Sequence, residues 1–100
     1  MSRPYISHDE ATAKSFRNDP SFAAEYLNSV LENGDQQEIM IALRRLADAF
    51  GMKEIADAAG LNSNTLYRTL SPAGNPQLRS LQSILGAMGM RLAVTPVAQQ

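Results

Sequence analysis

The stretch MKEIADAAGLNSNTLYRTLS, residues 52–71, is the feature that most restricts how this chain can fold. Small and apolar residues follow a helical spacing up to Gly60, and a second helical pattern starts directly after it. A glycine there supplies the positive φ of a tight turn, while Ala56 is small enough for two helices to cross closely. Leu61 follows the turn as an apolar plug. The pattern predicts two short helices, residues 52–59 and 63–70, whose inward side chains are Ile55, Ala56, Ala59, Leu66 and Leu70.

Helix start and stop signals divide the rest of the chain. Ser7 with Glu10 and Asp35 with Glu38 have the spacing of a capping box, and Asp19-Pro20 places an N-cap before a proline at the first helical position. Gly34 is expected to end its helix in the left-handed conformation. The sequence SPAGNP, residues 71–76, is expected to be a loop. Four more helices are therefore predicted, over about residues 8–17, 20–33, 36–50 and 78–88.

The end of the chain alternates between apolar and other residues in MRLAVTP, residues 90–96. This period of two predicts a short β-strand that Pro96 ends. A single strand leaves its backbone groups unpaired, so we expect it to pair with the same strand of a second copy. Addition to a partner's sheet and a frayed tail are the alternatives. The predicted dimer contacts are Leu81, Leu85, Met88, Met90, Leu92 and Val94.

These patterns predict an all-α fold of five to six helices with one short C-terminal β-strand. One hundred residues suffice for a single hydrophobic core, which we divide into an N-terminal helical segment, 1–34, and the remainder, 35–100. The chain has no Cys, which excludes disulfides and thiolate metal sites. Its N-terminus lacks the apolar centre of a signal peptide and no apolar run approaches 18 residues. We therefore expect a cytoplasmic protein with no membrane partner.

The exposed face of the second short helix is rich in amide and hydroxyl groups. In two helices crossed in this way, the N-terminal residues of the second can enter the major groove of DNA. The residues predicted to reach base edges are Ser63, Asn64, Tyr67 and Arg68. Those predicted to bond phosphates are Lys53, Asn62 and Thr65. The alternative is a simple corner between two helices, with Asn62 as N-cap and a solvated polar face.

The chain resembles a known family over about residues 5–95. The helices around the motif look like an Xre-type, phage-repressor-like helix-turn-helix domain. More narrowly, YLNSVLENGD, GMKEIADAAGLNSNTLYRTLSPAGNP and LGAMGMRLAV resemble HigA-like antidote proteins of toxin–antitoxin modules. The resemblance implies a homodimeric antitoxin that represses its own operon at double-stranded operator DNA and neutralises a RelE/ParE-like toxin, a small basic protein. By position, the residues that would read the operator are Ser63, Asn64, Thr65, Tyr67 and Arg68.

Other functions fit the sequence less well. The single histidine, His8, lies in the first turn of a predicted helix, and no catalytic set or phosphate-cradling glycine loop accompanies it. We therefore expect neither an enzyme nor a cofactor or metal. A stand-alone Xre-type transcriptional repressor without a toxin partner is the main alternative. It would share every feature of residues 35–96 and differ only in the role of residues 1–34, the candidate toxin-contacting region. A protein-interaction module that uses the same helices without DNA is the third.

Overall fold

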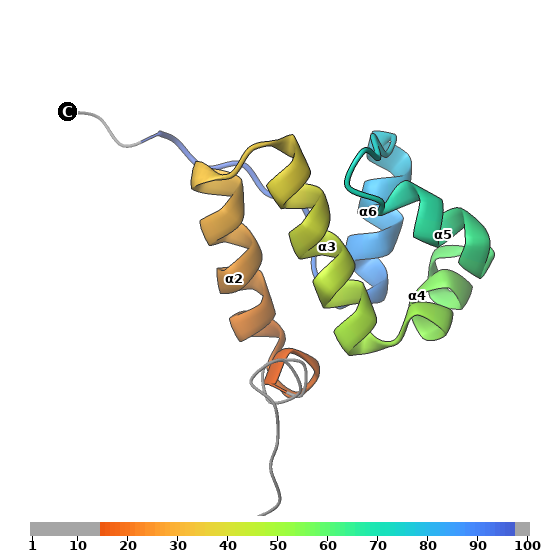
Figure 1. Cartoon of the computed structure of the whole chain (residues 1–100). Coiled ribbons are helices and arrows are strands. Elements are labelled where there is room, and N and C mark those ends of the chain that lie inside the picture. Colours follow the sequence, from red (N-terminus) through yellow and green to blue (C-terminus); the bar gives the residue numbers. More distant parts are fainter. Residues whose placement is uncertain (1–14, 98–100) are drawn as a thin grey trace, which may run out of the picture.

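The computed structural model describes residues 15–97, and within them the chain is helical (Figure 1). Residues 15–18 form the end of a first helix. The predicted start of that helix, with Ser7, His8 and Glu10, lies outside the described residues. The following helices are α2 (Pro20–Asn33), α3 (Gln36–Phe50), α4 (Met52–Ala59), α5 (Ser63–Thr69) and α6 (Leu78–Ala87).

The helix starts follow the predicted capping residues. The Asp19 side chain accepts hydrogen bonds from the backbone amides of Ser21 and Phe22, at 3.1 and 3.3 Å, with Pro20 at the first helical position. At α3 the capping box is complete, because Asp35 and Glu38 each accept the other's backbone amide at 2.9 Å. Such caps satisfy amides that have no partner inside the helix. Both predicted starts are confirmed.

Gly34 ends α2 for a different reason from the one predicted. Its φ is −85° and its ψ 154°, which is extended backbone that any residue can adopt, so the expected left-handed conformation is wrong. The constraint is space. A Cβ added at Gly34 would stand 2.7 Å from the carbonyl oxygen of Val30 and 2.9 Å from its Cγ1 atom.

We expect Gly34→Ala to lower the free energy of unfolding by about 1–3 kcal/mol, the usual range for overpacking. The control is Gly86→Ala on α6, where an added Cβ meets nothing within 4 Å. Alanine is a better helix former than glycine, so Gly86→Ala should stabilise the chain by roughly 0.5–1 kcal/mol. Urea unfolding of both variants measures the effects, and destabilisation of equal size in both would contradict the crowding argument.

The predicted C-terminal strand is absent. Residues 90–97 have no regular secondary structure in the described part of the chain, so an all-helical fold is observed and the strand prediction is wrong. The only backbone hydrogen bond of this segment runs from the Met90 amide to the Leu85 carbonyl, at 2.9 Å, and closes the end of α6. A strand is defined by pairing, and no described segment lies beside residues 91–97 as a pairing partner. Alternating side chains alone therefore do not make a strand here.

The helices form a chain of contacts rather than a symmetric bundle. α2 packs on α3, α3 on α4, and α4 on both α5 and α6. In Figure 1, α2 lies at one side of the molecule and α4 and α5 lie at the other, with α3 between them. One continuous core joins these contacts; its largest fully buried side chains are Phe16, Met40, Leu46, Leu66, Leu70, Ile84 and Met88. The two ends of the molecule thus present separate surfaces.

Candidate nucleic-acid interface

The turn between α4 and α5 has the geometry that its sequence predicts. Gly60 has φ 74° and ψ 28°, the left-handed conformation that glycine adopts without steric cost. Its amide donates to Asp57 at 3.2 Å, and the Leu61 amide donates to the carbonyl oxygen of Ala56 at 2.8 Å. These paired bonds form the Schellman arrangement that closes a helix. A non-glycine residue at position 60 would be strained by this φ alone, because an added Cβ would meet no atom within 4 Å.

Buried side chains on one face of α5 anchor this helix to the hydrophobic core. Leu66 is the one buried residue of this seven-residue helix, and Leu70, directly after it, is also fully buried. On α4, Ile55 and Ala56 are buried, as the sequence predicted. Ala59 and Leu61 are partly buried against the same core. The opposite side of α5 is therefore free to meet a partner.

The structure gathers the predicted DNA-contacting residues on and around this free side. Lys53 on α4 and Asn64, Tyr67 and Arg68 on α5 are exposed, while Ser63 and Thr65 are half-buried. Asn62 is exposed and caps α5, because its side-chain oxygen accepts the Thr65 amide at 2.7 Å. Only its amide nitrogen is left to donate to a phosphate. The N-cap role that the alternative interpretation gave to Asn62 is thus confirmed, and it does not compete with that donation.

Sequence reasoning missed one residue of this surface, Arg44 on α3. Its guanidinium carbon lies 4.5 Å from the centroid of the Tyr67 ring, and its Nε donates to both carboxylate oxygens of Asp48, at 3.2 and 3.3 Å. A cation over an aromatic face is attracted by the ring's negative charge distribution. The contact joins Tyr67 to α3 and brings the Arg44–Asp48 ion pair beside α5. The spacing of Arg44 and Asp48 predicts their ion pair, but nothing in the sequence predicts the contact with Tyr67.

A family model described as "Probable addiction module antidote protein" matches residues 9–96. The chain belongs to this family. An "Uncharacterized protein" of Haemophilus influenzae (strain ATCC 51907 / DSM 11121 / KW20 / Rd) is 33% identical over 69 residues, which cover 69% of this chain and 71% of the relative. No solved structure matches.

Membership of the addiction-module antidote family supports the antitoxin that the sequence resemblance implied, and with it a toxin as partner. It favours a regulatory protein over an enzyme. In residues 15–97 no group of three or more His, Cys, Asp or Glu side chains could hold a metal ion. None of the helices described there is long and apolar enough to span a bilayer.

The residues predicted to form a dimer lie in different environments. Leu85 and Met88 are buried in the chain's own core, and Leu81 and Met90 are half-buried against it. Leu92 and Val94 are exposed. Because Leu85 and Met88 already pack within the chain, they have little surface to offer a second copy. The dimer surface therefore cannot be assigned to this set as a whole.

Proposed function

We propose that this protein is an antitoxin that neutralises a toxin by direct binding and represses its own operon by binding operator DNA. The observation that supports the DNA-binding part is the free side of α5. It presents Asn64, Tyr67 and Arg68 on a short helix anchored by Leu66. An amide can pair with adenine and a guanidinium with guanine in the major groove, which is wide enough to admit a helix.

Residues around the N-terminus of α5 serve to position the helix on DNA. In this proposal the Asn62 amide nitrogen and the Thr65 hydroxyl, at the start of α5, donate to phosphate oxygens, and Lys53 adds a charge at the start of α4. Phosphate contacts fix the register of a protein on the duplex, whereas base contacts supply its specificity. The few cations on this surface imply weak binding by one chain. We therefore propose that two copies bind together on a palindromic operator.

The family match is what supports the neutralising part. An addiction-module antidote needs a toxin, and the resemblance to HigA-like proteins suggests a small basic toxin of the RelE/ParE-like class. A stand-alone repressor would share α4 and α5 but would not need a second partner surface. The family match therefore favours the antitoxin over the stand-alone repressor.

We expect Arg68→Ala to weaken specific binding to the chain's own promoter fragment by about 1–3 kcal/mol, because it removes a side chain that reaches a base edge. Titration of labelled promoter DNA at fixed salt measures the affinity. Random-sequence DNA of the same length, measured in parallel, separates specific from non-specific loss.

The matched control is Arg17→Ala. Arg17 is also an exposed arginine. It belongs to the helical segment 15–18 before α2, which lies on the other side of α3 from α5 (Figure 1). Both variants lose one positive charge, so an effect of net charge alone would weaken their binding to DNA equally. Equal affinity of Arg68→Ala and the parent chain for the promoter would contradict the assignment of α5 as the reading helix.

A further inference from the structure

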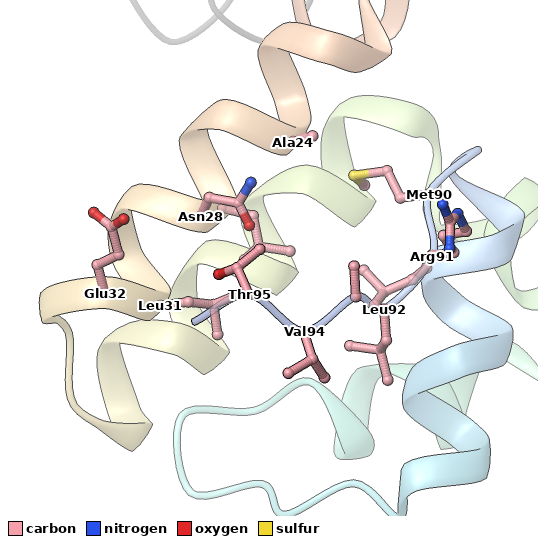
Figure 2. Close-up of a pocket in the computed structure, with 12 residues that line it drawn as sticks. Ala24, Asn28, Leu31, Glu32, Met90, Arg91, Leu92, Val94 and Thr95 are labelled. Atoms are coloured by element: carbon pink, nitrogen blue, oxygen red, sulfur yellow. The ribbon is translucent and has the colours of Figure 1, made fainter. Parts of the chain in front are cut away.

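A groove of about 660 Å³ lies between α2 and the segment that follows α6 (Figure 2). One wall is a face of α2, and the other is the backbone and side chains of residues 90–95. Figure 2 shows Thr95 directed towards Asn28 of α2, while Leu92 and Val94 point to the other side of the segment. The groove is on the opposite side of α3 from α4 and α5, so bound DNA would leave it open.

The walls of this groove are apolar and exposed. Leu31, on the α2 wall, is 48% exposed. Leu92 and Val94 are also exposed, at 38% and 98%, and lie on the outer side of the segment that forms the other wall. Apolar side chains gathered at a groove mark a surface that buries them against a partner. Leu27 and Leu85, also in the lining, are buried and connect the groove to the core. The base of the groove is thus part of the packed core, and side chains at its rim are exposed to a partner.

The second wall also offers unused backbone groups. In the described part of the chain, residues 91–97 make no backbone hydrogen bond. Unpaired amides and carbonyls along such a segment are a template for another strand. Strand addition obtains its affinity from main-chain bonds and its specificity from alternate side chains. Leu92 and Val94 alternate along the segment with Ala93 and Thr95. This alternation, on which the incorrect strand prediction was based, suits binding by strand addition.

The charge around the groove specifies the partner further. Between residues 18 and 43 the sequence has no Lys or Arg, and its carboxylates are Asp19, Glu25, Glu32, Asp35 and Glu38. Glu32 lines the groove itself, where Arg91 is the cationic residue of the lining. A partner strand with apolar residues, a Lys or Arg facing Glu32 and a carboxylate facing Arg91 would complement this surface.

We infer that the groove between α2 and residues 90–95 belongs to the toxin-binding site. An edge strand of the toxin pairs with residues 91–95 beside the groove, so that its side chains on one face contact Leu31 and those on the other face contact Leu92 and Val94. This inference rests on the neutralising part of the proposed function. Within residues 1–34, the candidate toxin-contacting region, it specifies the face of α2 beside Leu31, and it joins that face to residues 91–95 in one site.

The test uses the full chain and the purified small protein encoded beside its gene, with binding measured by calorimetry. Leu31→Glu and Val94→Glu should each weaken binding at least tenfold, because each places a charge on an apolar contact. The matched control is Leu78→Glu, the same change at a leucine that is 64% exposed and lies outside the groove. Far-ultraviolet circular dichroism of each variant confirms that it is folded.

Main-chain pairing has its own test. Successive amides of a strand point to opposite edges, so only one of Leu92→Pro and Ala93→Pro removes a donor from the edge that meets the toxin. We expect one of these variants to lose at least tenfold in affinity and the other to lose clearly less. Equal affinity of both for the small protein would overturn strand pairing.

The outcomes separate the two proposals. If the neighbouring protein does not bind the parent chain, both the neutralising function and this inference are wrong. If it binds the parent and the two glutamate variants equally well, the function stands and the groove assignment is wrong. If Leu31→Glu instead converts a dimer to a monomer by ultracentrifugation without weakening toxin binding, a second copy occupies the groove and the inference is again overturned.

Discussion

Leu66→Ala should lower the free energy of unfolding by about 2–5 kcal/mol, the usual cost of truncating a fully buried leucine. It should also abolish promoter binding at concentrations where Arg68→Ala still binds. Leu66 has no exposed surface and is the one buried residue of α5. Without it this short helix loses its attachment to α4, and the residues beside it no longer share one rigid face. Urea unfolding and promoter titration measure the two effects.

The control for this prediction is Leu78→Ala, the same chemical change at the first residue of α6. Leu78 is 64% exposed, so its truncation should change the unfolding free energy by no more than about 0.5 kcal/mol. Hydrogen exchange adds a local measurement. In Leu66→Ala the amides of α5 should exchange faster than those of α3. Intact promoter binding by a destabilised Leu66→Ala would show that α5 does not read DNA.

The features that the sequence predicted well are those set by neighbours in the chain. The capping box of Asp35 and Glu38, the N-cap Asp19 and the left-handed Gly60 each depend on bonds within five residues. Local hydrogen bonds of this kind have recognisable residue spacings. The helix bounds and the buried face of α4 and α5 follow from them together with the apolar period. The helical fold was therefore predictable.

The features that were missed depend on segments distant in the sequence. The Arg44–Tyr67 contact joins α3 to α5. The C-terminal strand failed because pairing needs a second segment, which alternation cannot supply. Leu85 and Met88 were expected to border a dimer interface because they precede the predicted strand. Both are buried in the chain's own core, and helical spacing does not say whether an apolar face meets that core or another copy. The groove beside Leu31 was missed for the same reason.

Gly34 gives a smaller example of the same limit. A glycine after a helix usually indicates a left-handed cap, and Gly60 and Gly89 have the positive φ that this requires, 74° and 80°. Gly34 instead avoids the Val30 side chain and carbonyl. Sequence alone does not distinguish a glycine that is required because its φ is positive from one that is required because a Cβ would clash with a neighbouring atom.

The last prediction concerns the arrangement of two copies on DNA. If each chain makes few phosphate contacts, an operator must engage two copies held at a fixed distance, with half-sites about one helical turn, roughly 34 Å, apart. Inserting half a turn, about five base pairs, between the half-sites turns one of them to the opposite side of the duplex. We expect this insertion to abolish binding in a gel-shift titration, while base changes in a spacer of unchanged length should leave it nearly intact. Footprinting of the parent fragment first locates the half-sites. Unchanged affinity after the insertion would mean that each copy binds alone, and the proposed two-fold arrangement would then be wrong even if α5 reads the DNA.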